Sequence, residues 1–514
     1  FLGGGCYNFT IVFLNNERFN TMIVECKHKK ESFQNVFDFM NYVEFVLAQS
    51  IYYKNKNLGE YYTNAYCQII NDILEKTYNG SFHHYAKLKH SIDFKYDIKI
   101  CIKNIKKRFL FGNQIDYRYL LLAQVLHACK MLDINLDENK LELCRKHLSM
   151  SKKAFNIAVE YAKNPSNIKE QKIQKTFEKY VEFSNKQNFY RNTPIRHIGI
   201  CANMSCGKST FVNALLGNDF LPARNEATTA CVTSVYDYDF ATHLLGMAIK
   251  ENHTYSISDN ADVSVVNAWN AEADHIILQA DLDNISNENT IAAVHDTPGV
   301  NNSANDEHKK VTMEFFGNNK MDLILYVANA EHLATEDDKN LLVELRDKIL
   351  PKSKSKMLFV INKFDSIDLS KESKDDIVIR YLEFLEDLGF EKPKIYPISS
   401  KAARLFKMAL NGRVDLFSEN ELDEFKPLVN KFNKRLNLTA NNDVFYIKET
   451  IQRSLEFGES ITLDGEEVEI QKIYQALKNT GLLGLESDIE TLLSNNEMQR
   501  GNSTLPETFF SKAK

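Results

Sequence analysis

The fold of this chain is indicated most clearly by residues 198–216, which read Ile198-Gly199-Ile200-Cys201-Ala202-Asn203-Met204-Ser205-Cys206-Gly207-Lys208-Ser209-Thr210-Phe211-Val212-Asn213-Ala214-Leu215-Leu216. A short apolar strand runs into a loop with a glycine and a lysine, and a helical pattern follows at once. A phosphate-binding loop requires this order of strand, loop and helix. The sequence therefore predicts a nucleotide site here, although Ala202 stands where the usual pattern has its first glycine.

The residues of this loop have separate predicted roles. Backbone N–H groups and the helix N-terminus should surround the β-phosphate. Lys208 should neutralise charge on the β- and γ-phosphates, and the hydroxyl of Ser209 should hold Mg²⁺. The loop residues that we expect to contact the nucleotide are Asn203, Met204, Ser205, Cys206, Gly207, Lys208, Ser209 and Thr210. The loop alone does not choose between ATP and GTP.

A second motif, Asp296-Thr297-Pro298-Gly299, follows the apolar run 291–295. An aspartate at a strand end can hold Mg²⁺ through water, and the N–H of Gly299 can contact the γ-phosphate. A threonine between the loop and Asp296 should complete the Mg²⁺ shell, and the candidates are Thr228 and Thr229. The metal site therefore draws on Ser209, Asp296 and one of these threonines.

Two later motifs favour guanine over adenine. Asn362-Lys363-Phe364-Asp365 follows the apolar run 357–361, and Ser399-Ser400-Lys401 follows the run 394–398. The carboxylate of Asp365 can accept the N1–H and the exocyclic amine of guanine, whereas adenine would leave that charge without partners. Lys363 can lie along the base, Asn362 can bond N7 and tie loops together, and an N–H such as that of Ser400 can read the guanine O6. Four motifs in this order, each after an expected strand, predict GTP or GDP binding.

Short apolar runs alternate with helical patterns through the whole of this region. Runs at 196–201, 291–295, 323–328, 357–361 and 394–398 predict buried strands. Helical patterns lie between them, at 341–350 with Thr335 as the N-cap and at 377–388 before Gly389. The alternation predicts an α/β fold, a mostly parallel sheet with helices on both faces. Helical patterns flank it, at 117–132, 141–162, 173–183 and 470–493, and residues 7–14 and 22–26 read as strands.

The composition is that of a folded protein of the cytoplasm. Hydrophobic residues make up 44% of the 514 residues, and the net charge is -6. General nucleic-acid binding normally needs a marked basic excess, which is missing here. Nine cysteines, scattered through the chain up to Cys231 without CxxC pairs, predict buried reduced thiols. The sequence has no run of 18 apolar residues and no signal-peptide pattern, so we expect neither export nor a membrane span.

The sequence resembles the bacterial dynamin-like proteins, within the dynamin superfamily of large GTPases. The resemblance rests on residues 204–217, on Phe220-Leu221-Pro222, on Thr228-Thr229-Ala230 and on Asp296-Thr297-Pro298-Gly299-Val300. It covers the α/β domain, and outside that domain only the helical layout matches. It implies a GTPase head on a helical neck and trunk. The implied segments are an N-terminal mainly helical trunk or assembly region (1–135), a helical neck or trunk segment (136–193), the GTPase domain (194–426) and a C-terminal helical neck or trunk segment (427–514).

The resemblance also implies a mode of action. Such proteins pair head to head across the nucleotide, assemble through their trunks, and bind, tether or remodel membranes; several act as two different dynamin-like chains in one complex. The implied location is the cytoplasmic face of the cell membrane, bound peripherally. By position, Thr229 matches the switch threonine, and Ser205 matches the serine that holds a monovalent cation in the head dimer of relatives. The implied catalytic set is Lys208, Ser205, Thr229 and Asp296.

Met204 stands where eukaryotic dynamins carry a glutamine that helps to place the attacking water. A methionine cannot do that, so hydrolysis must rely on the backbone near Thr229 or on a partner, or be slow. A weakly hydrolysing scaffold subunit of a hetero-oligomer is therefore one alternative. A GTPase of ribosomes or RNA is another, although such proteins usually carry basic modules.

A protein that acts on membranes without spanning them needs a basic and apolar contact. The candidate residues are Lys106, Lys107, Arg108, Phe109 and Phe111. Clustered cations beside bulky apolar side chains suit an anionic lipid surface, at roughly 1 kcal/mol for each lysine. The alternative is a solvated face with the phenylalanines in the core. Leu482-Leu483-Gly484-Leu485 is a second candidate, with packing inside the protein as its alternative.

Overall fold

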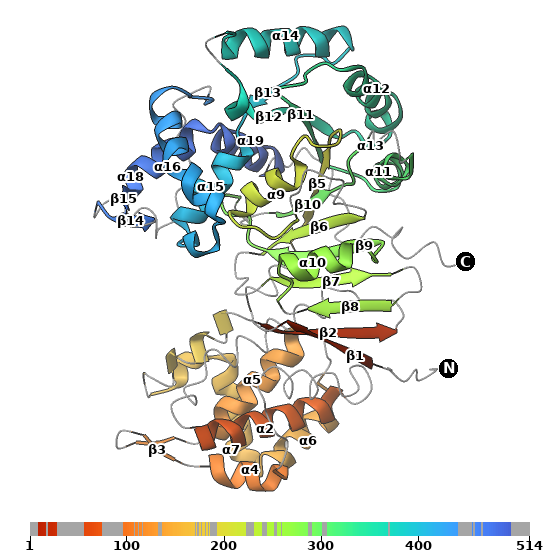
Figure 1. Ribbon diagram of the computed structural model, residues 1–514. Coiled ribbons are helices and arrows are strands. Elements are labelled where there is room, and N and C mark those ends of the chain that lie inside the picture. Colours follow the sequence, from red (N-terminus) through yellow and green to blue (C-terminus); the bar gives the residue numbers. More distant parts are fainter. Residues whose placement is uncertain are drawn as a thin grey trace. The chain divides into compact units, whose positions relative to one another are not determined.

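In the computed structural model of the chain, the apolar runs around the phosphate loop form the parallel part of one sheet (Figure 1). Its strands are β5 (Ile195–Cys201), β10 (Ile291–Asp296), β11 (Leu323–Asn329), β12 (Lys356–Asn362) and β13 (Ile395–Pro397). They lie in the order β10-β5-β11-β12-β13, and each neighbouring pair is parallel. All six residues of β10 are buried, as in a parallel strand covered on both faces. The predicted α/β fold is confirmed.

The long stretch between the phosphate loop and Asp296 extends this sheet beyond β10. It supplies β6 (Val232–Asp237), β7 (Leu245–Ile249) and β9 (His275–Ala280), in the order β7-β9-β6-β10. β6 is parallel to β9, and the other two pairings are antiparallel. Helix α10 (Val263–Asn270) covers this part and buries Trp269, which is 4% exposed.

Helices lie on both sides of the parallel strands. Figure 1 shows α9 (Lys208–Leu216), α15 (Ser400–Leu410) and α19 (Leu482–Ser494) on one side, and α11 (Asp306–Asn318), α12 (Glu336–Glu344) and α13 (Leu350–Ser353) on the other. α14 (Lys374–Asp387) follows β12 and ends before Gly389, whose φ is +84°. Thr335 caps α12 as predicted, in a capping box with Asp338. The predicted helix 341–350 is divided, because a π-helical turn at Leu345–Ile349 separates α12 from α13.

The C-terminal helices pack in the same unit as the sheet. The helical pattern at 470–493 corresponds to two helices, α18 (Ile470–Asn479) and α19, because Gly481 between them has a φ of +81°. Leu482, Leu483 and Leu485 are buried, so this apolar run packs inside the protein and does not face lipid. The expected domain boundary at 426 falls inside α16 (Glu419–Lys434).

The chain forms two compact units, residues 193–252 with 260–514 and residues 1–192 with 253–259. The second of these contains the antiparallel strands β1 (Phe9–Asn16), β2 (Phe19–Lys27) and β8 (Thr254–Ser258). Its helices are α2 (Lys56–Leu74), α4 (Ile98–Ile105), α5 (Tyr117–Met131), α6 (Glu138–His147) and α7 (Lys152–Lys163). The two expected strands are present, and the other described elements of this unit are mostly helices. Six cysteines in the described parts of the chain are free and buried, as predicted.

The structure describes residues 9–16, 19–27, 56–74, 96–106, 108–110, 113–115, 117–131, 136–169, single helical positions between 171 and 185, and 193–222, 231–238, 244–250, 254–258, 260–285, 290–300, 306–368, 371–439, 455, 458–463 and 466–494. Within these ranges, every helix is too short or too polar to cross a lipid bilayer.

Three histidines and Ser234 form a hydrogen-bonded chain across neighbouring strands of the sheet. His197 Nδ1 lies 2.9 Å from His295 Nε2, and Ser234 Oγ lies 2.6 Å from His295 Nδ1 and 2.8 Å from His275 Nε2. A neutral imidazole offers one donor and one acceptor, so the chain is satisfied while the rings are neutral. Burial lowers the pKa of His197 and His295, and it lowers the pKa of His275 to about 3.

The free energy of unfolding of the unit that contains these histidines should fall as the pH drops below about 6.5. Below this pH the unfolded histidines gain protons that the folded state excludes. Each histidine contributes up to about 1.4 kcal/mol per pH unit, and this stability is fully present at higher pH. Urea unfolding between pH 7 and pH 5.5 measures how the free energy of unfolding changes with pH. In His275→Leu this slope should be smaller by the contribution of one histidine. Burial raises the pKa of Asp296 and Glu486, which opposes the slope equally in both proteins. An unchanged slope in the variant contradicts the prediction.

Candidate nucleotide-binding site

The phosphate loop joins β5 to α9 in a conformation that needs left-handed residues. Ser205 has a φ of +58° and Gly207 a φ of +84°. A Cβ on Gly207 would lie 2.6 Å from Asn362 Nδ2, so the close packing of the two loops also requires glycine. The N–H of Met204 donates to the carbonyl of Val300 at 3.0 Å, and the N–H of Val300 donates to Ala202 O at 3.2 Å. The loop is therefore fixed to the segment that carries the Asp296 motif.

Lys208 is the first residue of α9 and is 8% exposed. Its Nζ lies 3.1 Å from the place that a Cβ on Gly299 would occupy, so the two predicted γ-phosphate contacts lie side by side. In the described part of the chain its ammonium makes no hydrogen bond or ion pair. A buried ammonium without an acceptor suits an anionic ligand that supplies one.

Asp296 and Ser209 meet at the end of β10. The Ser209 hydroxyl donates to Asp296 Oδ2 at 2.9 Å. Asp296 is 1% exposed, and its Oδ1 has no hydrogen-bond partner among the described residues. Burial raises the pKa of Asp296, while Lys208 and the Ser209 hydroxyl oppose that shift. A buried carboxylate oxygen beside a hydroxyl is a donor set that fits Mg²⁺. Thr228 and Thr229 lie outside the described residues.

Asp338 of α12 also holds the phosphate loop in place. The amide of Asn203 donates to Asp338 Oδ1 at 2.7 Å, and the hydroxyl of Tyr326 donates to the same oxygen at 2.6 Å. Oδ2 of Asp338 closes the capping box with Thr335. The helix-capping pattern explains why an aspartate stands at position 338, but nothing in the sequence indicated that Asp338 contacts the phosphate loop.

The residues predicted to read the base converge at the ends of β12 and β13. Asn362 links the two loops, because its Nδ2 donates to Cys206 O at 2.9 Å and its Oδ1 accepts the Ser400 N–H at 3.0 Å. The hydroxyl of Ser399 donates to Asp365 Oδ1 at 2.6 Å. This bond fixes one oxygen of the carboxylate expected to bind guanine.

Two lysines complete this side of the site. Lys363 has a φ of +65°, and its Cε lies 3.9 Å from the Cβ position of Gly207, so its stem runs past the phosphate loop. Lys401 forms an ion pair with Glu424 of α16, at the surface. The Ser400 N–H is already bonded to Asn362. The Lys401 N–H lies in the first turn of α15, where N–H groups have no intrahelical acceptor.

The residues proposed to contact lipid are described only in part. Lys106 is exposed, and Arg108 and Phe109 lie in β3 (Arg108–Leu110), which pairs with β4 (Asn113–Ile115). The side chains of Arg108 and Phe109 lie outside the described residues, as do Lys107 and Phe111.

Residues 198–364 match the Dynamin family. The chain is 25% identical over 455 residues to Dynamin-like protein 1 of Campylobacter jejuni, covering 77% of this chain and 58% of that protein. It is 27% identical over 237 residues to an uncharacterized protein of Caldicellulosiruptor, covering 45% of this chain and 53% of that protein. The chain thus spans little more than half the length of these relatives.

The chain also has a weak likeness to solved structures. One belongs to an oligomerised bacterial dynamin pair associated with long-range sensing and tethering of membranes (TM-score 0.33, 18% identity, 72% of this chain and 67% of that chain). Another is Aquifex aeolicus Era bound to GDP and aluminium fluoride (TM-score 0.26, 18% identity, 46% and 67%). Together, the motif order, the confirmed α/β fold and the family match show that residues 198–364 carry a GTPase domain of the dynamin kind.

Proposed function

We propose that this chain binds GTP with Mg²⁺, hydrolyses it, and uses the cycle as an oligomer that binds, tethers or remodels membranes. The observation that carries the nucleotide part is a buried lysine close to a buried carboxylate oxygen that has no hydrogen-bond partner among the described residues. Lys208 offers a buried cation, and Asp296 offers a buried carboxylate oxygen beside the Ser209 hydroxyl. Lys208 would bind the phosphates, while Ser209 and Asp296, the latter through water, would hold the Mg²⁺. The metal would supply charge neutralisation at the phosphates.

Guanine recognition would come from Asp365, whose carboxylate the Ser399 hydroxyl orients. Two donors on guanine face two acceptors on this carboxylate, which is a strong basis for discrimination. Lys363 would lie along the base. The Lys401 N–H, in the first turn of α15, is the better candidate to read O6, because the Ser400 N–H already binds Asn362.

Hydrolysis requires a water placed in line with the γ-phosphate. Met204 has no group that can orient water, and its Cγ lies 3.0 Å from the Cβ position of Gly299. The proposed placement therefore depends on Thr229 and its backbone, and Ser205 is proposed to hold a monovalent cation between paired heads. Ser205 is exposed in a left-handed conformation, which is compatible with a contact made by assembly.

The membrane part of the proposal rests on the family and on the cluster Lys106, Lys107, Arg108, Phe109 and Phe111. With liposomes that contain anionic lipid, the full chain should sediment in the presence of a GTP analogue. Replacing Lys106, Lys107 and Arg108 with glutamine should reduce the bound fraction, because roughly 1 kcal/mol is lost for each cation near the surface. A triple Gln variant of the exposed cations Lys152, Lys153 and Lys163 on α7 is the matched control.

Wild-type protein that stays in the supernatant under all lipid and nucleotide conditions would contradict the membrane proposal. Equal binding of the two triple variants would place the contact elsewhere in the chain. Neither outcome bears on nucleotide binding, which is measured separately.

A second candidate function is a weakly hydrolysing subunit that pairs with another dynamin-like chain. Met204 and its packing against Gly299 favour it, because the loop then lacks a water-orienting side chain. Turnover of the chain alone, and again with a second dynamin-like chain, separates the two proposals. Fast turnover by this chain alone excludes the second.

A further inference from the structure

The loop proposed to read guanine is contacted from behind by the turn between α18 and α19. The N–H of Ser399 donates to the carbonyl of Thr480 at 3.1 Å. The hydroxyl of the same serine donates to Asp365 Oδ1 at 2.6 Å, and Ser399 and Thr480 are both fully buried. Ser399 therefore connects the carboxylate to a residue that lies 115 positions further along the chain.

Gly481 allows this close approach. Its φ is +81°, and a Cβ there would lie 2.3 Å from the carbonyl oxygen of Pro397 and 3.4 Å from Ile398 Cγ2. Backbone atoms cannot give way to a contact of 2.3 Å, so a side chain at this position must separate the turn from the end of β13. Leu482, directly after it, is fully buried and anchors the turn to the core.

A second contact reaches Asp365 from α16. The ammonium of Lys431 donates to the main-chain carbonyl of Asp365. The end of α16 is itself fixed to α18, because the amide of Asn479 donates to Phe432 O at 2.9 Å. The backbone of Asp365 is thus held directly by Lys431 of α16, and its side chain is held by Ser399, which the turn between α18 and α19 contacts in turn.

We propose that Gly481, Thr480 and Lys431 are positioning residues that set the guanine specificity of the site by fixing Ser399 and Asp365. The inference rests on the proposed role of Asp365 in reading guanine. A carboxylate discriminates between bases when both of its oxygens are aligned with the donors on the base, since hydrogen bonds weaken steeply with angle. Displacing the turn would rotate the carboxylate and reduce its selectivity more than its contact with the phosphates.

The test compares GDP with inosine diphosphate, which lacks the exocyclic amine but has the same phosphates. We expect the wild type to bind GDP at least about tenfold more tightly, because one hydrogen bond to a charged group is lost. In Gly481→Ala the ratio of the two dissociation constants should fall toward one. Gly412→Ala is the matched control, because Gly412 has a φ of +70° and open space around its Cβ position.

The second pair of variants removes the lysine without adding bulk. Lys431→Met should lower the ratio, whereas Lys434→Met, an exposed position on the same helix, should leave it unchanged. If Gly481→Ala does not fold, the comparison of Lys431→Met with Lys434→Met tests the inference alone. Equal ratios in Lys431→Met and Lys434→Met, or in Gly481→Ala and Gly412→Ala, overturn the inference. A wild type that does not distinguish the two nucleotides contradicts the role of Asp365 itself. Failure of the positioning residues can therefore be told apart from failure of the proposed role of Asp365.

Discussion

Replacing Lys208 with alanine is expected to lower the affinity for GDP and GTP by more than about a hundredfold. Lys208 is 8% exposed, its ammonium makes no hydrogen bond or ion pair with the described residues, and it lies beside Gly299. Removing one member of a buried charge pair costs about 3–5 kcal/mol, because the phosphate oxygens lose their cation in a site that excludes water. Titration calorimetry with GDP in the presence of Mg²⁺ measures the loss.

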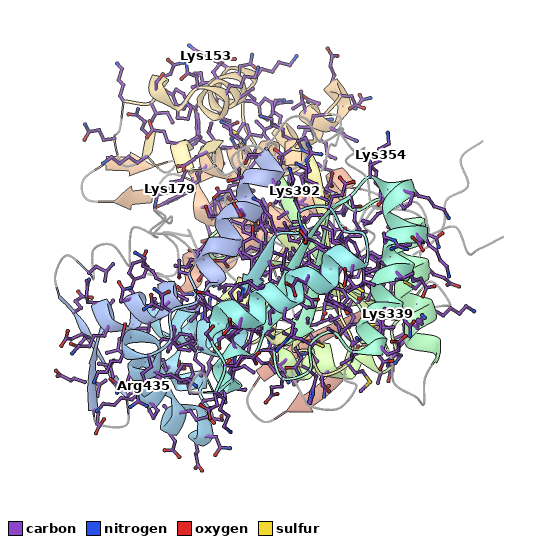
Figure 2. All side chains as sticks on the ribbon, turned by 90° about the horizontal axis from the view of Figure 1, so that it is seen from above. Lys153, Lys179, Lys339, Lys354, Lys392 and Arg435 are labelled. Atoms are coloured by element: carbon purple, nitrogen blue, oxygen red, sulfur yellow. The ribbon has the colours of Figure 1, made fainter. Side chains whose placement is uncertain are left out.

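The matched control is Lys339→Ala, on the exposed face of α12, whose side chain is labelled in Figure 2. This lysine makes a surface ion pair with Glu336, so its removal should leave both affinity and stability unchanged. If Lys208→Ala binds GDP as tightly as the control, the loop does not bind phosphate in the proposed way.

Replacing Asp365 with asparagine is expected to change which base is bound. Guanine presents its N1–H and its exocyclic amine, two donors that suit the two oxygens of a carboxylate. In asparagine one oxygen becomes an amide donor, which faces the amine of guanine but can donate to the C2 carbonyl of xanthine. GDP should bind about a hundredfold more weakly than to the wild type, and xanthosine diphosphate should bind more tightly than GDP.

Competition for a fluorescent nucleotide gives both affinities on one protein. Asp368→Asn, an exposed position three residues along, serves as the control and should retain the wild-type preference. A variant at position 365 that still prefers GDP would show that another residue reads the base. Because Lys208 and Asp296 are unchanged, total loss of binding is not expected.

The phosphate side of the site could be predicted from sequence because its parts are local. A strand, a loop and a helix N-terminus are consecutive in the chain, and the chemistry of Lys208 and Ser209 follows from their places in that order. The alternation of apolar runs likewise predicted the parallel strands, and Thr335 predicted the start of α12. Periodicity did not predict the π-helical turn at Leu345–Ile349, which divides α12 from α13.

The supports of the site could not be predicted in the same way. Asp338 contacts Asn203 across 135 positions, and Thr480 contacts Ser399 across 81. Asn203 and Ser399 belong to recognisable motifs, but no pattern in the sequence pairs them with Asp338 and Thr480. The helical pattern at 470–493 concealed the turn, although Gly481 inside it was a signal that the pattern ends there. The histidine chain depends on strand register, which brings His197, His275 and His295 together only in the folded sheet. Contacts that depend on register and helix docking are not encoded in local spacing.

This chain is expected to carry a guanine-specific, Mg²⁺-dependent nucleotide site. Calorimetric titration of the wild-type chain with GDP and with ADP tests this expectation most directly. In the presence of Mg²⁺, GDP should bind to one site per chain and ADP at least about a hundredfold more weakly, since adenine cannot satisfy the carboxylate of Asp365. Chelating Mg²⁺ should weaken GDP binding. Comparable binding of ADP, or no binding of either nucleotide, would contradict this expectation.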